Sequence, residues 1–317
     1  MTEATVTGAG VERWSDYRHL SPDDRRPPDA PGVFFDPVDT EVGVWAAVDL
    51  VRPGATVLDF GSGSGAAASA VARAGAGHVH GLDVSVESVD WASGHYRLEN
   101  GSGRVTFELA DYTCLSSAQL LETTPFGAGH PPDVVMSNPP YVPVPPPPPG
   151  TTRVSIDGGA DGLRLVRVVV GHAASLRSAL GLTIGSYTSV RQAASLLAES
   201  GYGISSITLS ALRLGEYTVR NSERVLDLER RGEGPLLRTD DGAVHYIVVG
   251  LSCRRLADPG DPGGAGCPVS PDALLELLRL ACQSTTVALE ALDGPGFTFP
   301  VPVRVLVLPD VPGRLHC

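Results

Sequence analysis

The sequence predicts an α/β fold in which a mainly parallel sheet has helices on both faces. Two observations carry this prediction. Short apolar segments typical of strands alternate with segments typical of helices along most of the chain, as in βαβ units. In addition, three strand segments lead into polar residues, namely Asp83, Asp111 and Asn138, and strand ends in such sheets are where ligands bind.

Length and charge narrow the classes of function. The chain has 317 residues and a formal net charge of -12, which allows one large domain with extensions or two small ones. The negative charge disfavours nucleic acid, because phosphate contacts need a positive face, and it favours a neutral or cationic small molecule. No apolar run is long enough to cross a membrane, and residues 1–10 carry no export signal. We therefore expect a soluble, cytoplasmic protein.

Cysteine and histidine spacing argues against a metal site. The five cysteines and eight histidines are scattered, without the paired spacings of zinc ligands. His78 and His80 alternate on one strand segment, and we expect them to serve packing. The sequence therefore predicts reduced thiols and no bound metal.

The motif from Asp59 to Gly65 leads from the first buried strand into a glycine-rich turn. Gly61, Gly63 and Gly65 allow a ligand to approach the backbone closely, and the turn is expected to present free N–H groups at the start of a helix. The next strand ends at Asp83, whose carboxylate is suited to two ribose hydroxyls. This spacing also fits a dinucleotide-binding fold, although the pattern is not GxGxxG.

The third strand segment, Val105 to Ala110, leads into Asp111 and Tyr112. A carboxylate at this position is suited to an adenine amino group, and Tyr112 lies beside it. The alternative is that Asp111 is a turn residue that closes the strand.

The fourth strand segment ends in Asn138-Pro-Pro-Tyr141. The two prolines fix the backbone, so that the Asn138 amide oxygen and the carbonyl of Pro139 are held at the strand's end. Together these acceptors suit the two hydrogens of an NH2 group, and Tyr141 offers a face to its carrier. The motif predicts a nitrogen-binding site, and the alternative is a proline-rich turn.

Two flanking segments are candidate walls of this site. Residues 32–41 precede a helix that Asp39 or Thr40 would cap, and as a lid they would place Asp36 over a ligand. Residues 143–160 begin with a polyproline stretch, which we interpret as a pocket rim with a mobile flap. A domain linker or a docking site for a polyproline-binding protein is the alternative.

Together these motifs resemble the class I methyltransferases that depend on S-adenosylmethionine (SAM), and among them the amino-group branch that includes the release-factor glutamine N5-methyltransferases. The resemblance runs from about Phe34 to about Ser200. It implies a Rossmann-like, seven-stranded methyltransferase sheet. It also implies roles for residues of this chain. SAM would contact the glycine motif and the strand ends, at Asp59, Gly61, Gly63, Gly65, Asp83, Asp111 and Tyr112. The target nitrogen would be held by Asn138, Pro139 and Tyr141.

The resemblance implies transfer of the SAM methyl group to a nitrogen. Release-factor methyltransferases have a helical N-terminal domain that grips a protein, whereas only about thirty residues precede residue 32 here. We therefore expect an amine or amide of a small molecule as substrate, in natural-product metabolism such as antibiotic biosynthesis. Asp36 or Asp111 would take the proton from an ammonium substrate.

Two other functions fit the same motifs. The nitrogen site could direct an amine onto a carbon of its own molecule and close a small N-heterocycle, as in the aziridine-forming type of methyltransferase-like cyclase. Asp36 and Asp111 would then orient or deprotonate the amine. The other alternative is a non-catalytic subunit that stabilises a partner.

We predict three regions along the chain. Residues 1–31 form an N-terminal arm with a helix near residues 11–20, and residues 32–256 form the catalytic domain, with a solvated insertion at 220–241. Residues 257–317 form a C-terminal extension with a helix at 271–282 and a strand at 297–308. This extension either packs back on the domain or binds a second copy or a small partner protein.

Overall fold

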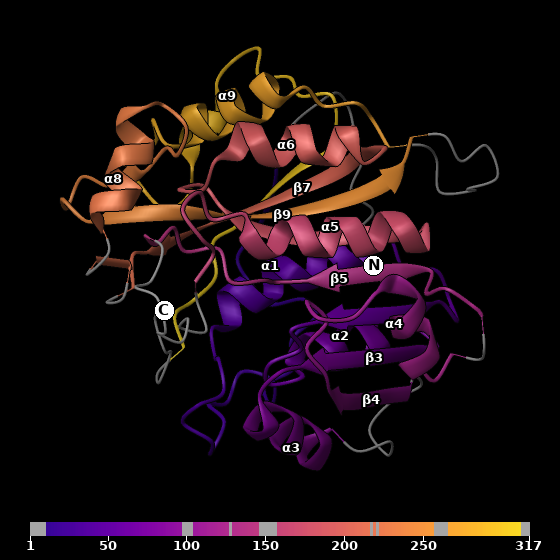
Figure 1. The fold of residues 1–317 in the computed structure, drawn as a ribbon. Coiled ribbons are helices and arrows are strands. Elements are labelled where there is room, and N and C mark those ends of the chain that lie inside the picture. The colour runs from indigo at the N-terminus through magenta and orange to yellow at the C-terminus, as the bar shows by residue number, and fades with distance from the viewer. Residues whose placement is uncertain are drawn as a thin grey trace.

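The computed structural model describes residues 11–96, 104–126, 129–145, 157–215, 218–219, 222–256 and 266–311. Within these residues, ten strands form one sheet with helices on both faces (Figure 1). The strands are β1 (Glu12–Trp14), β2 (Thr56–Phe60), β3 (His78–Asp83), β4 (Arg104–Leu109), β5 (Val134–Ser137), β6 (Ala179–Gly185), β7 (Tyr202–Arg213), β8 (Leu237–Arg238), β9 (Val244–Arg255) and β10 (Val303–Leu306).

The helices lie between the strands in the predicted alternation. They are α1 (Pro37–Val48), α2 (Ala66–Arg73), α3 (Val86–His95), α4 (Ser117–Thr123), α5 (Arg164–Leu176), α6 (Val190–Glu199), α8 (Ser222–Arg230), α9 (Pro271–Ala281) and the 3-10 helix η2 (Glu290–Asp293).

The order of strands in the sheet is β1-β10-β7-β9-β6-β5-β2-β3-β4, and β8 pairs with β9. Strand β9 is antiparallel to β6, β7 and β8, and the other pairs are parallel. The seven strands from β7 to β4 form the predicted Rossmann-like methyltransferase sheet. Strands β10, β1 and β8 are additions to it.

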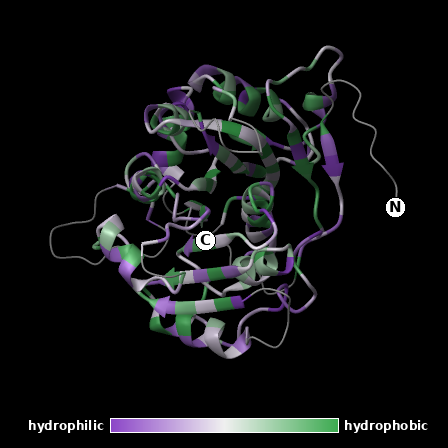
Figure 2. Cartoon of the chain, turned by 90° about the vertical axis from the view of Figure 1, so that its right-hand side faces the viewer, coloured by the Kyte–Doolittle hydropathy of each residue, from purple (hydrophilic) through white to green (hydrophobic). Residues whose placement is uncertain are grey.

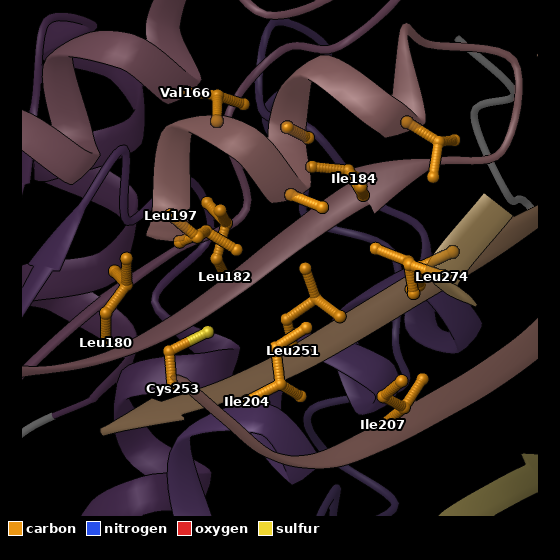
Figure 3. Close-up of a cluster of buried hydrophobic side chains, with 14 of the residues drawn as sticks. Val166, Leu180, Leu182, Ile184, Leu197, Ile204, Ile207, Leu251, Cys253 and Leu274 are labelled. Carbon is orange, nitrogen blue, oxygen red and sulfur yellow. The ribbon is translucent and has the colours of Figure 1, made fainter. Parts of the chain in front are cut away.

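Alternate residues of the central strands face two different apolar layers. On β2, Leu58 and Phe60 belong to one cluster of buried residues, and Val57 belongs to another. The first cluster includes residues of α5, α6 and α9, whereas the second includes residues of α1 and α2. Figure 3 shows part of the first layer, where Leu197 and Val166 lie over the strands. Each large apolar side chain that is fully buried contributes roughly 1.5–3 kcal/mol, so these layers hold the helices on the sheet.

Helix α1 begins earlier than predicted. Its N-cap is Asp36, whose side chain accepts hydrogen bonds from the N–H groups of Val38 and Asp39 at 3.1 Å each. The prediction of Asp39 or Thr40 as the cap is therefore wrong. Pro37 explains the difference, because proline is favoured at the first helical position, directly after the cap.

The N-terminal segment forms a strand where we predicted a helix. Strand β1 pairs in parallel with β10, which in turn pairs in parallel with β7. Behind it, the carboxylate of Glu41 on α1 is fully buried and accepts hydrogen bonds from the N–H groups of Arg18, His19 and Leu20. The segment is thus tied to the domain by contacts with distant residues, which local sequence patterns do not reveal.

The C-terminal residues pack against the same domain. Helix α9 contacts α6, and β10 joins the sheet beside β7. The predicted strand at 297–308 is too long, since β10 begins only after Pro302, and a proline has no N–H to donate to a ladder. Binding of a second copy or of a small partner protein by these residues stays a prediction.

The predicted insertion at 220–241 is not wholly solvated. Helix α8 buries Val225 and Leu228, and the short strand β8 continues from it to pair with β9. Figure 2 shows that helices at the surface carry hydrophilic and hydrophobic residues side by side. In the part of the chain that the structure describes, no helix combines the length and the apolar character that a membrane span requires.

Glu41 gives a first prediction, because it joins the N-terminal segment to α1. Burial alone would raise the pKa of Glu41, but hydrogen bonds from His19 and from the backbone more than offset this, so that the pKa is lowered. Its stabilising contribution should therefore be complete above the ordinary pKa of 4.5 and be lost as the pH falls through the lower, folded-state value.

We expect Glu41→Ala to lower the free energy of unfolding at pH 7 by roughly 3 kcal/mol or more, because each buried donor left without an acceptor costs about 1–3 kcal/mol. Chemical denaturation measures this loss. Glu199→Ala, on the exposed side of α6, is the control and should change stability by less than about 0.5 kcal/mol. Equal effects of the two substitutions would contradict the anchoring role.

Candidate functional site

The strand order reverses between β2 and β5. From β2 the chain continues outward to β3 and β4, and from β5 it continues in the other direction to β6. The hydroxyl of Ser137, at the end of β5, donates to the carbonyl of Phe60, at the end of β2, at 2.7 Å. The glycine turn and Asn138 therefore leave the sheet side by side, at the place where open α/β sheets bind ligands.

A cavity opens at this edge. It is lined by residues of the lid segment and α1, of the glycine turn and α2, and of the end of β5: Phe34, Thr40, Gly43, Asp59, Gly61, Ser62, Gly63, Ser64, Ala67, Met136, Ser137 and Asn138. Of the predicted site residues, Asp59, Gly61, Gly63 and Asn138 are among them. The lid segment, the glycine turn and the turn at Asn138 thus meet in one cavity.

Three buried polar atoms of this lining have no hydrogen-bond partner among the described residues. They are the Asp59 Oδ2, the Ser62 Oγ and the Asn138 Oδ1. A buried polar group without a partner costs about 1–3 kcal/mol, and folded proteins rarely leave several together. The Asn138 Oδ1 is a pure acceptor, and the Asp59 Oδ2 is one whenever its carboxyl group is ionised, so the cavity suits a ligand that brings hydrogen-bond donors.

Among these three groups, Asp59 is the one whose pKa is shifted. Its side chain is only 2% exposed, at the end of β2. Burial raises the pKa of Asp59 to about 7, and the nearby charge of Asp83 adds to this rise. At neutral pH the carboxyl group is therefore close to the midpoint of its titration.

The glycine turn differs from the prediction in one respect. We expected free N–H groups, but most of them are engaged: Gly61 and Ser62 donate to the carbonyl of Leu82, and Gly65 donates to Ser62. Gly63 donates to the Asp83 Oδ2 at 2.8 Å. A loop that binds phosphate needs free N–H groups, so this turn is shaped for a ligand without phosphate there. The dinucleotide alternative loses its main support.

Asp83 holds the turn in place through both carboxylate oxygens. Its Oδ1 accepts from the N–H of Ser85 at 2.8 Å, while its Oδ2 accepts from Gly63. Each carboxylate oxygen has about two acceptor sites, so capacity remains for a ligand hydroxyl. Asp83 is also half-buried, and its position at the end of β3 agrees with the predicted ribose contact.

Tyr141 lies deeper than we predicted. Its side chain is 6% exposed, and its hydroxyl donates to the Asp39 Oδ2 at 3.0 Å. The rings of Tyr187 and Tyr246 lie 6.0 and 6.3 Å from it, centroid to centroid. Burial and the charge of Asp39 hold the pKa of Tyr141 well above its ordinary value. In this structure the tyrosine braces the turn behind Asn138 and does not line the cavity.

The last residues of the predicted flap close on the same turn. Asp157 forms a bridge with Val142, and a Cβ on Gly158 would lie 2.7 Å from the Tyr141 backbone. Glycine at position 158 thus allows the chain to return directly onto the turn. Residues 146–156 of the predicted flap lie outside the described residues.

Seven predicted site residues lie outside the cavity lining: Gly65, Asp83, Pro139, Tyr141, Asp36, Asp111 and Tyr112. The last three have contacts elsewhere. Asp36 is 5% exposed and caps α1, as described above. Asp111 is exposed and accepts from the N–H and hydroxyl of Thr113, and these hydrogen bonds lower its pKa. The ring of Tyr112 stacks on Phe60 inside the core, with centroids 4.7 Å apart.

Sequence reasoning missed several lining residues. Ser62 lies inside the glycine motif, so its position could have been inferred, but its orphaned hydroxyl could not. Thr40 and Gly43 occupy successive turns of α1, on the side that faces the cavity. Helical spacing from the lid segment is the signal that would have identified them.

The comparison with protein families agrees with the predicted family. Residues 57–126 match the family model described as a methyltransferase domain. This match shows a methyltransferase domain over residues 57–126, within the Rossmann-like methyltransferase fold that the strand order above shows. It ends before Asn138, so it does not bear on the nitrogen-binding motif. No curated protein matches the chain in sequence.

Solved structures of methyltransferases also resemble the chain. A proposed RNA methyltransferase from Pyrococcus horikoshii has 16% identity and a TM-score of 0.45, over 77% of this chain and 92% of that one. The magnesium protoporphyrin IX methyltransferase of Synechocystis with bound SAH has 17% identity and a TM-score of 0.40, over 68% and 81%. The E. cuniculi Mtq2-Trm112 complex is responsible for methylation of the eRF1 translation termination factor. It has 19% identity and a TM-score of 0.38, over 69% of this chain and 98% of that one. At these values the likenesses decide nothing about the substrate.

Gly65 gives the second prediction, because both the backbone conformation of the turn and the packing around it require glycine. Its φ of +80° disfavours other residues, and a Cβ would lie 2.7 Å from the Phe107 Cζ and 2.9 Å from the Ala92 Cβ. We expect Gly65→Ala to lower the free energy of unfolding by about 2–5 kcal/mol, from backbone strain of about 1–2 and overpacking of about 1–3 kcal/mol.

The matched control is Gly54→Ala. Gly54 has a φ of +82°, but nothing lies within 4 Å of its Cβ position, so only the backbone strain applies. Urea denaturation of both variants separates the two effects. Equal losses of stability would mean that Phe107 and Ala92 make room for a methyl group, contrary to the prediction.

Proposed function

We propose that the protein binds SAM in this cavity and catalyses transfer of its methyl group to a nitrogen atom of a small molecule. The observation that carries the proposal is the set of three buried, unpartnered polar atoms on one cavity wall. The family match over the glycine turn supports SAM as the ligand.

The residues present fit this cofactor. Asp59 offers a buried carboxyl group to the ammonium of its amino-acid part, and Asp83 has acceptor capacity left for ribose hydroxyls. The engaged N–H groups of the turn suit a molecule that lacks phosphate. When bound, SAM supplies an electrophilic methyl group on a sulfonium, so the protein needs no metal or nucleophile for the transfer.

Asn138 is the residue that we propose selects nitrogen as the atom to be methylated. Its Oδ1 is a buried acceptor without a donor among the described residues, and the adjoining prolines keep it from turning away. A substrate N–H that donates to it, and to the carbonyl of Pro139, would keep the nitrogen lone pair free for the methyl carbon. Positioning of this kind contributes up to about 7–11 kcal/mol to lowering a barrier.

The proposed substrate class follows from the charge of the chain and of the cavity lining. The chain carries a net charge of -12, and the described cavity lining contains one acidic residue, Asp59, and no basic one. A neutral or cationic amine, or an amide, suits such a wall better than a phosphorylated substrate. We infer a small-molecule substrate of specialised metabolism. Asp36 and Asp111, the proton acceptors predicted from the sequence, lie outside the described cavity lining, so we assign the proton to neither of them.

The test combines binding with product detection. Titration calorimetry with SAM, followed by mass spectrometry of reactions with a panel of amines, should reveal binding and a product heavier by one methyl group. Asn138→Ala should retain SAM binding and lower methylation by about 10²- to 10³-fold, since one acceptor aligned with the reacting group is lost. Gln192→Ala, an exposed amide on α6, is the control and should leave both unchanged.

Two outcomes would contradict the proposal. If Asn138→Ala methylates its substrate as fast as the wild type, Asn138 does not bind the target nitrogen. Binding of SAM without any methylated product, together with a cyclised amine, would favour the N-heterocycle-forming alternative.

A further inference from the structure

We propose that Asp59 is protonated while the cavity is empty and gives up its proton when the cationic end of the cofactor binds. Cofactor binding would then release one proton to the solvent. This inference rests on the proposed function, because it takes the ligand to be SAM or its product S-adenosylhomocysteine, both of which carry an α-ammonium group.

The geometry of Asp59 is the first support. The side chain is 98% buried, it belongs to the cavity lining, and its Oδ2 has no hydrogen-bond partner among the described residues. An ionised carboxylate in such a place lacks both water and a donor. A protonated carboxyl group avoids this cost while the cavity holds no cation.

The charges around Asp59 are the second support. On the neighbouring strand β3, Asp83 faces it with a like charge. The other cavity-lining residues are uncharged: Met136, Ser137 and Asn138 from β5 and its end, Thr40 and Gly43 from α1, Ala67 from α2, Phe34 from the lid segment, and the residues of the glycine turn. Within the described lining, no protein cation offsets a charge on Asp59.

The titration of Asp59 agrees with this geometry. Burial, and secondarily the charge of Asp83, raise its pKa to about 7. A bound ammonium group would supply the missing opposite charge and favour the ionised form. The proton moves from the carboxyl group to the buffer, and an ion pair between carboxylate and ammonium takes its place.

Linkage fixes the size of the expected effect. At pH 6 the empty site holds about 0.9 protons on Asp59, and this is the number that binding should release. Below pH 7 the affinity should fall with pH, approaching about tenfold for each pH unit well below the pKa. Free α-amino groups have lost half of their protons near pH 7.7–8.0, so the informative range is about pH 5.5–7.

The experiment uses S-adenosylhomocysteine, which binds without reacting. Calorimetric titration of the full-length protein at pH 6, in buffers with different ionisation enthalpies, measures the protons released. The expected value is close to one. The ligand control is 5′-methylthioadenosine, which lacks the amino-acid part and should bind without proton release.

Asp59→Asn tests the assignment to this residue. The amide cannot titrate, so the variant should bind S-adenosylhomocysteine more weakly, without proton release and with an affinity independent of pH over that range. Circular dichroism checks that the variant is folded, and the wild-type measurement decides the matter even if it is not.

The outcomes separate the two proposals. Binding without proton release, or release that persists in Asp59→Asn, would overturn the role of Asp59 and leave the proposed function intact. No binding of S-adenosylhomocysteine at any pH would overturn the cofactor assignment as well.

Discussion

The pairing of β2 with β5 is the constraint on which the site depends. It brings the end of one strand, with its glycine turn, next to the end of another, with its proline-fixed turn, and the Ser137 hydroxyl joins the two. Because the sheet order reverses here, the connections that follow β2 and β5 lead away in opposite directions. The cavity is therefore a result of topology, and the side chains give it chemical character.

That character comes from polar groups that the protein leaves unsatisfied. The fold engages the N–H groups of the glycine turn with Leu82 and Asp83, yet it leaves the acceptors of Asp59 and Asn138 without donors. A site that has used its donors and kept its acceptors favours ligands rich in N–H and O–H groups. SAM and an amine substrate both fit this description.

Much of the fold could be predicted from the sequence. The strands that end at Asp83 and Asn138, and the glycine turn between β2 and α2, follow from local patterns that the structure confirms. Strand β1 could not be predicted, because its partner β10 is almost three hundred residues away in the sequence.

Some residues of the site could be predicted from their type alone, because glycine and proline determine the backbone conformation at those positions. Gly61, Gly63 and Asn138 reach the cavity because glycine and proline fix the turns around them. The burial of Tyr141 and Tyr112 depends on how distant helices and strands pack, which short motifs do not encode.

A crystal structure of the protein with S-adenosylhomocysteine tests the central claim most directly. We predict that the ligand occupies the cavity between the glycine turn and Asn138, with its ammonium group against Asp59 and its ribose hydroxyls against Asp83. Density for the ligand elsewhere, or an empty cavity at saturating concentration, would contradict it.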